Sequence, residues 1–272
     1  MSELIRLEGV GLRRGGKTLL QGVSGSLTAG ELIAVVGPNG AGKSSLFRAI
    51  AGDWRPCQGH IWLHGKPTQT YAPDARARRM AVMTQSAHLS FEFTVAELVG
   101  LGLFSHPQLC TTERERLIEQ ALALADLQGL ESQTWPTLSG GERQRVQFAR
   151  TWIQSAGQPE GFVWLLDEPT SALDLAHQAR LLTHAQLHAR TGGGVIAILH
   201  DLNLALAFAD HVWVMVNGRC IEQGDAQSVL TPALVRTVWK LDATRVDING
   251  RAHLCMGYPL ENTGMRPQAS AL

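Results

Sequence analysis

The residues from Gly37 to Ser44 read Gly-Pro-Asn-Gly-Ala-Gly-Lys-Ser, which is the spacing GxxxxGK[ST]. Glycines in such a loop let backbone N–H groups turn toward phosphate oxygens, and a helix that begins near Lys43 adds the positive end of its dipole. Lys43 would reach the terminal phosphates of a nucleotide, and the Ser44 hydroxyl would bind Mg²⁺. The loop therefore predicts a site for ATP and Mg²⁺ made by Gly37, Pro38, Asn39, Gly40, Ala41, Gly42, Lys43, Ser44 and Ser45.

Two adjacent carboxylates, Asp167 and Glu168, follow directly on an apolar run that ends at Leu166. Carboxylates at the end of a buried strand are costly unless a positive group meets them. Ligands bind at this edge of an α/β sheet, so Asp167 is placed to bind Mg²⁺ and Glu168 to accept a proton from an attacking water. His200 ends another apolar run and would point to the same edge. The alternatives are a solvated Asp-Glu-Pro-Thr turn and a strand-end histidine bonded to backbone, and the phosphate loop in the same chain favours the catalytic interpretation.

The segment Leu138–Arg145 reads Leu-Ser-Gly-Gly-Glu-Arg-Gln-Arg and predicts a second anion-binding helix start. Ser139 can cap a helix and Glu142 can close the capping box, while Gly140 and Gly141 expose backbone N–H groups. One nucleotide needs only one phosphate loop. The second site therefore indicates that this segment closes over a nucleotide held by another copy of the chain.

Three apolar runs must position these groups, namely Leu32–Val36, Phe162–Leu166 and Val195–Leu199. Each is apolar on both faces, as a buried parallel strand is. Leu175–Ala189 has helical spacing, so the second half of the chain alternates strand, helix and strand. Residues 3–36 show shorter strand-like runs broken by glycines, and residues 94–155 are mostly helical in pattern.

The composition excludes several classes of protein. Among 272 residues, 24 basic and 24 acidic side chains give a net charge of zero, which argues against a nucleic-acid binder. The first residues do not resemble a signal peptide, and no run approaches the ~20 apolar residues that cross a bilayer. Four scattered cysteines without a CxxC pair indicate reduced thiols. We expect a soluble or peripheral protein of the cytosol.

Three histidines, His177, His184 and His188, recur on one face of the predicted helix. They could suggest a metal or heme site. No carboxylate or cysteine joins them at ligand spacing, so we interpret the face as solvated.

Together these motifs resemble the ABC ATPase family, over nearly the whole chain to about residue 240. The resemblance implies an α/β fold of the P-loop NTPase type, with a mostly parallel sheet core, an N-terminal antiparallel β subdomain and a helical subdomain at about residues 90–155. The ATPase domain would span residues 1–258, and residues 259–272 would be a loose tail.

The resemblance also assigns roles to single residues. Gln85 would be the Q-loop glutamine that contacts Mg²⁺ and senses the membrane subunit, Ser139–Glu142 the signature and Asp174 part of the D-loop. His200 would be the switch histidine. The family usually stacks adenine on an aromatic residue of the first strands, where this chain has Arg13 and Arg14. A guanidinium plane can stack on a base, so we expect Arg14 beside adenine.

Within the family, four segments are most similar to importer ATPases for iron chelates, cobalamin and hemin, the hemin type above all: Arg78–Gln85, Phe91–Val95, Asp174–Gln178 and Leu199–Ala205. This implies a subunit that hydrolyses ATP to energise hemin uptake across the bacterial inner membrane. A ferric siderophore or cobalamin is the alternative cargo, and a cytosolic ABC ATPase without a transport role or a module that holds ATP without hydrolysing it is a further alternative.

The same resemblance implies the partners. These are a second copy of the chain in a head-to-tail ATP sandwich, two transmembrane permease subunits and, indirectly, a periplasmic substrate-binding protein, with no nucleic acid. The protein would lie on the cytoplasmic face of the inner membrane. We expect the permease to dock just after Gln85, on Leu89, Phe91 and Phe93.

Overall fold

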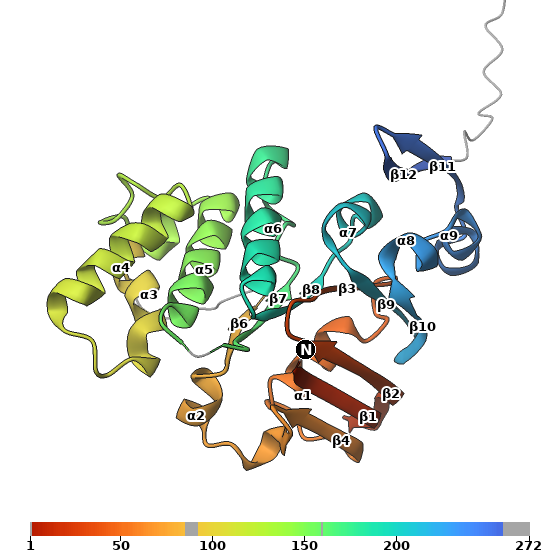
Figure 1. The fold of residues 1–272 in the computed structure, drawn as a ribbon, viewed down its shortest axis with the longest axis horizontal. Helices are drawn as coiled ribbons and strands as arrows, with labels where there is room; N and C mark the ends of the chain where they lie inside the picture. The colour runs from red at the N-terminus through yellow and green to blue at the C-terminus, as the bar shows by residue number, and fades with distance from the viewer. Residues whose placement is uncertain (1, 85–91, 159, 258–272) are drawn as a thin grey trace, which may run out of the picture.

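The structure is a computed structural model that describes residues 2–84, 92–158 and 160–257 (Figure 1). A six-stranded sheet with the order β10-β9-β3-β8-β7-β6 forms its centre. Its strands are β3 (Leu32–Val36), β6 (Met80–Met83), β7 (Val163–Asp167), β8 (Gly194–Ile198), β9 (His211–Val216) and β10 (Arg219–Asp225). All neighbours are parallel except β9 and β10. The three predicted apolar strands are therefore confirmed, and they lie side by side as β3, β8 and β7.

Helices cover both faces of this sheet because its strands are apolar on both faces. Successive residues of a strand point to opposite sides. Ala34 and Val36 pack with residues of α6 (Leu175–Arg190) and α7 (Leu202–Phe208), and Ile33 and Val35 pack with α1 (Lys43–Ile50). The predicted helix at residues 175–189 is confirmed as α6.

The N-terminal part forms a separate antiparallel sheet with the order β2-β1-β4-β5, below the central sheet in Figure 1. Its strands are β1 (Glu3–Arg14), β2 (Lys17–Thr28), β4 (Gln58–Leu63) and β5 (Lys66–Pro67). The sequence predicted short runs broken by glycines, but β1 and β2 are continuous over 12 residues each. Gly9 and Gly22 lie inside them with positive φ at irregular pairing, so these glycines produce bulges and not breaks.

A group of helices packs round its own apolar core at one end of the molecule. It comprises α3 (Val95–Gly100), η2 (Leu101–Ser105), α4 (Thr111–Leu124), η3 (Trp135–Thr137) and α5 (Gly140–Ser155). Val99, Leu122 and Val146 meet in this core and are almost fully buried. The first turn of α5 lies against the loop that follows β7, where a Cβ at Gly141 would be 3.0 Å from the carbonyl oxygen of Ala172.

The hairpin of β11 (Asp242–Ile248) and β12 (Arg251–Gly257) lies at the opposite end (Figure 1). The remaining short elements are η1 (Thr68–Thr70), α2 (Pro73–Ala77), α8 (Ala226–Val229) and α9 (Pro232–Trp239). The Asn203 side chain of α7 exchanges two hydrogen bonds with the backbone of Leu254 in β12, at 2.8 and 3.1 Å. The predicted tail, residues 259–272, lies outside the described residues, and the predicted domain limits stay a prediction. In the part of the chain that is described, no helix is long and apolar enough to cross a membrane.

Candidate functional site

The loop between β3 and α1 wraps round the side chain of Lys43. The Lys43 ammonium donates hydrogen bonds to the carbonyl oxygens of Gly37 at 2.7 Å and Pro38 at 3.0 Å. Gly37 has a φ of 148°, and a Cβ there would lie 2.1 Å from the carbonyl oxygen of Met215 in β9. Only glycine fits at this position, so the tight path of the loop depends on it.

A cleft of about 530 Å³ opens beside this loop. Seven of the predicted phosphate-loop residues line it, from Asn39 to Ser45, together with Glu168. Its other wall was not predicted and consists of Thr18, Leu19, Gln21, Asn217 and Gly218. These five residues carry no motif, and they reach the loop because β2 packs against the turn between β9 and β10.

Ser44 and Asp167 meet at the carboxyl edge of the central sheet. The Ser44 hydroxyl donates to a carboxylate oxygen of Asp167 at 3.5 Å. Burial, together with the neighbouring carboxylate of Glu168, raises the pKa of Asp167 to about 6. Burial also lowers the pKa of Lys43, against the opposing effect of these two carboxylates. A hydroxyl beside a desolvated carboxylate is a set of hard oxygen donors that fits Mg²⁺, so the residues present fit the predicted metal.

Glu168 and His200 meet across the ends of β7 and β8. His200 Nε2 lies 2.7 Å from Glu168 Oε1. The Glu168 side chain is 15% exposed and lines the cleft. Glu168 has a φ of 52°, a left-handed conformation that costs about 1–3 kcal/mol in a residue other than glycine. Such strain is typical of functional residues that their surroundings hold in place.

The start of α5 has the predicted capping box. Ser139 Oγ accepts from the backbone N–H of Glu142 at 3.3 Å, and the Glu142 carboxylate accepts from the Ser139 N–H at 2.7 Å. Among the described residues that line the cleft, none comes from Ser139–Glu142. Asp174 is also separate from the cleft and caps α6, where its carboxylate accepts from the N–H of His177 at 2.9 Å.

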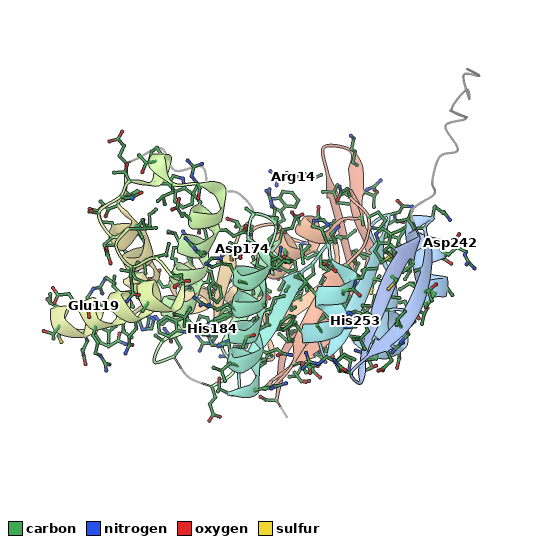
Figure 2. All side chains as sticks on the ribbon, turned by 90° about the horizontal axis from the view of Figure 1, so that it is seen from above. Arg14, Glu119, Asp174, His184, Asp242 and His253 are labelled. Atoms are coloured by element: carbon green, nitrogen blue, oxygen red, sulfur yellow. The ribbon has the colours of Figure 1, made fainter. Side chains whose placement is uncertain are left out.

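Arg14 lies at the end of β1 and does not line the cleft (Figure 2). Its guanidinium lies over the ring of Trp54 at 4.3 Å, and Arg48 lies over the same ring at 4.7 Å. Arg14 thus stacks on Trp54 within its own chain, and the predicted contact of Arg14 with adenine stays a prediction.

Gln85, Leu89 and Phe91 lie outside the described residues, so the predicted Q-loop contact and most of the docking surface stay predictions. Phe93 is described. It is partly buried and packs against the core of the α3–α5 helices, so it does not offer the exposed ring that the docking hypothesis assumed.

The sequence suggested a solvated histidine face on α6, but the three histidines are half-buried and His188 packs on the sheet. The ring of His188 stacks on Trp164 with 4.0 Å between centroids, and its Nε2 lies 2.9 Å from the carbonyl oxygen of Phe162. Burial lowers the pKa of His188 to about 4. His184 packs near Phe148, farther along the helix from Asp174 (Figure 2). Within the described ranges, no group of three or more His, Cys, Asp or Glu side chains could hold a metal ion.

The comparisons with known proteins agree with this geometry. A family model described as ABC transporter matches residues 20–171. The hemin import ATP-binding protein HmuV of Bradyrhizobium diazoefficiens is 43% identical over 247 residues, which cover 89% of this chain and 91% of that protein. HmuV of Pseudomonas aeruginosa is 43% identical over 242 residues, which cover 88% and 93%. Among solved structures, a chain of a transporter assigned to the metal-chelate type, in an inward-facing conformation, is 25% identical with a TM-score of 0.77 and covers 95% of this chain and 98% of its own.

Proposed function

This chain belongs to the ABC transporter ATP-binding family, and from that premise we propose that it is the subunit that hydrolyses ATP to drive hemin import. One observation carries the hydrolytic part. The adjacent parallel strands β3, β8 and β7 bring the phosphate loop, His200 and the Asp167–Glu168 pair to one edge, with His200 2.7 Å from Glu168. Hydrolysis of a nucleoside triphosphate requires a phosphate-binding loop and a positioned carboxylate at the same edge of the sheet.

Each residue then has a role in the proposed reaction. The phosphate loop and Lys43 hold the phosphates, while Ser44 and Asp167, with Gln85, would hold Mg²⁺, which neutralises charge on the terminal phosphates. Glu168 accepts a proton from the attacking water at its carboxylate. His200 keeps that carboxylate facing the cleft through its own hydrogen bond. Thr18, Gln21 and Asn217 offer polar contacts to the rest of the nucleotide from the other wall.

We further propose that the reaction takes place in a head-to-tail pair of chains. The capped start of α5 offers N–H groups at Gly140 and Gly141 but does not line the cleft of its own chain. An anion site of this kind fits the terminal phosphate of a nucleotide held by a second copy. Asp174, at the start of α6, would lie near the same contact.

The cargo is proposed from the relatives. Curated proteins that are about two-fifths identical to this chain are named for hemin import. The similar solved structure belongs to a transporter described as metal-chelate type, so a ferric siderophore or cobalamin is the alternative cargo. In either case the subunit would work with two permease subunits and a periplasmic binding protein, at the cytoplasmic face of the inner membrane.

Reconstitution tests this proposal. The chain should be purified with its permease, placed in vesicles that enclose ATP and Mg²⁺, and given the binding protein loaded with hemin. We expect hemin uptake and ATP hydrolysis to rise together. Uptake of a ferric siderophore or of cobalamin without uptake of hemin would show that the proposed cargo is wrong. The proposed ATPase function would then still stand.

A further inference from the structure

The loop from Glu168 to Asp174 joins β7 to α6, and side chains of α5 hold it from outside. The first of these is Gln144. Its amide N–H donates to the carbonyl oxygen of Glu168 at 2.6 Å, and its amide oxygen accepts from the N–H of Ala172 at 2.8 Å. One side chain thus fixes two points of the loop, and one of them is the strained backbone of Glu168 itself.

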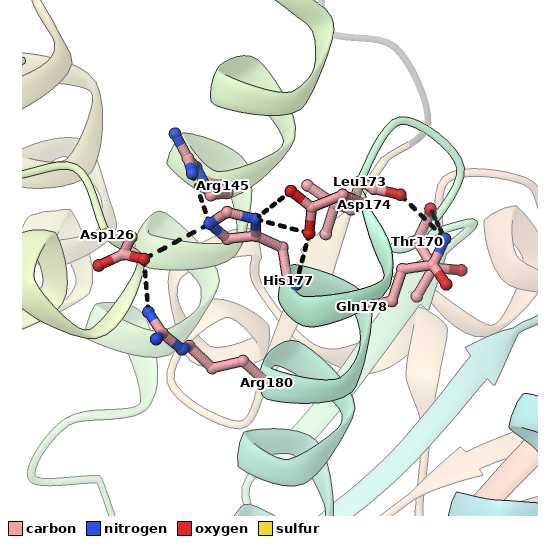
Figure 3. Close-up of polar contacts among 8 residues, drawn as sticks. All are labelled: Asp126, Arg145, Thr170, Leu173, Asp174, His177, Gln178 and Arg180. Carbon is pink, nitrogen blue, oxygen red and sulfur yellow. Dashed lines mark hydrogen bonds and ion pairs between the residues drawn. The ribbon is translucent and has the colours of Figure 1, made fainter.

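The next residue of α5 reaches the other end of the loop through His177. Arg145 lies 2.6 Å from His177 Nε2, and His177 Nδ1 lies 2.9 Å from the Asp174 carboxylate (Figure 3). A guanidinium can only donate, so Nε2 must accept and the ring proton must sit on Nδ1, from which it is donated to Asp174. The chain Arg145–His177–Asp174 is therefore a directed path of hydrogen bonds.

A second carboxylate and a second guanidinium lie next to the His177 ring. An Asp126 oxygen lies 3.5 Å from His177 Nε2 and 2.6 Å from the guanidinium of Arg180 (Figure 3). Asp126 follows α4, so this part of the network also joins the α3–α5 helices to α6. In the interior of the loop, the amide of Gln178 donates to the carbonyl oxygens of Thr170 and Leu173 at 3.1 and 3.0 Å.

We propose that Gln144 and His177 are positioning residues, which tie the start of α5 to the loop that carries Glu168. Neither side chain lines the nucleotide cleft, so they act through Glu168 and Asp174 and not on the nucleotide held by this chain. The first turn of α5 is the proposed contact with the nucleotide of the second copy. When that contact forms, it would set the position of Glu168 on the chain to which this α5 belongs. This inference rests on the proposed ATPase function.

The test replaces the amide of Gln144 by a side chain of similar length, Gln144→Met, and the imidazole by a ring without hydrogen bonds, His177→Phe. The matched control is Gln154→Met. Gln154 is on the same helix and also donates to backbone carbonyl oxygens, but those belong to Ala77 and Met80, away from the loop. All variants are measured in the assembled transporter, for kcat, KM for ATP, nucleotide binding and thermal unfolding.

We expect kcat to fall by about tenfold or more in Gln144→Met and His177→Phe, because small displacements of a reacting group cost large factors. KM and nucleotide binding should stay within about twofold, since the binding contacts are untouched. Gln154→Met should lose stability to a similar degree and keep its kcat. If Gln144→Met does not fold, Gln144→Glu keeps the acceptor for Ala172, removes the donor to Glu168, and should show the same fall in kcat.

Two results would overturn the inference. One is a kcat near that of the parent in these loop variants. The other is a loss that appears in KM or in nucleotide binding. A different result would contradict the proposed function itself, namely a parent protein that shows no ATP hydrolysis dependent on Glu168.

Discussion

His200 Nε2 and Glu168 Oε1 lie 2.7 Å apart, although the two residues come from different strands of the sheet. The pair exists because β7 and β8 are parallel neighbours, so the groups that follow them emerge at the same edge. Glu168 can therefore be held in place without a contact to the nucleotide.

The first prediction concerns that pair. His200→Ala removes the hydrogen bond that orients Glu168 and should lower the rate of hydrolysis by about 10²-fold, within the range for general acid–base groups. Binding of ATP should be retained, because His200 does not line the cleft. The measurement is steady-state phosphate release together with nucleotide binding by the same preparation. Unchanged turnover would show that Glu168 needs no such partner.

The second prediction concerns the path of the phosphate loop. Gly37→Ala places a Cβ 2.1 Å from the carbonyl oxygen of Met215, and this backbone atom cannot move aside easily. Gly40→Ala is the matched control, because its Cβ meets nothing within 4 Å and only the positive φ of 78° is unfavourable. We expect Gly40→Ala to cost about 1–2 kcal/mol in the free energy of unfolding and Gly37→Ala clearly more. Equal losses in urea unfolding would contradict the close approach.

The third prediction concerns pH and stability. The pKa of His188 is lowered to about 4 from an ordinary value of 6.5, because burial against Trp164 disfavours the charged ring. Between these values the unfolded chain binds a proton that the folded chain does not, so stability is lost as the pH falls from 6.5 toward 4. The slope from this group is at most about 1.4 kcal/mol per pH unit.

The control for this effect is His188→Phe, which keeps a ring on Trp164 and removes the titration. Other groups titrate equally in both proteins, so the difference between their unfolding free energies isolates His188. We expect the stability advantage of the parent at pH 7 to shrink as the pH is lowered. Parallel curves would place the His188 ring in a solvated setting.

The fourth prediction concerns the second copy. The Glu168→Gln variant with saturating ATP and Mg²⁺ should form a dimer in sizing experiments, and Gly141→Arg in the same background should not. A Cβ at Gly141 would already be 3.0 Å from the carbonyl oxygen of Ala172, so an arginine there would crowd the proposed contact with the second copy. A monomer at saturating ATP, even beside the permease, would count against the shared site.

The sequence predicted the parts of the site that depend on local pattern. Apolar runs located β3, β7 and β8, because strands buried on both faces have no polar alternation. The capping box of Ser139 and Glu142 was predicted for a similar reason, since both its partners lie within one helical turn.

Contacts between distant segments were not predictable in this way. Gln144 was part of a recognised motif, but its bonds to Glu168 and Ala172 appear only when α5 is packed beside β7. The packing of His188 on Trp164 replaced a predicted solvated face for the same reason. The contact of Arg14 with Trp54, which comes from a later segment of the chain, was not predicted either.

The most direct test of the account is hydrolysis by Glu168→Gln, which keeps the shape of the side chain and removes the group proposed to take the proton. Binding of ATP and Mg²⁺ should match the parent, and phosphate release by the assembled transporter should fall by about 10²–10⁴. Near-normal turnover by this variant would contradict the claim that Glu168, held by His200 at the edge of the sheet, is the base for ATP hydrolysis.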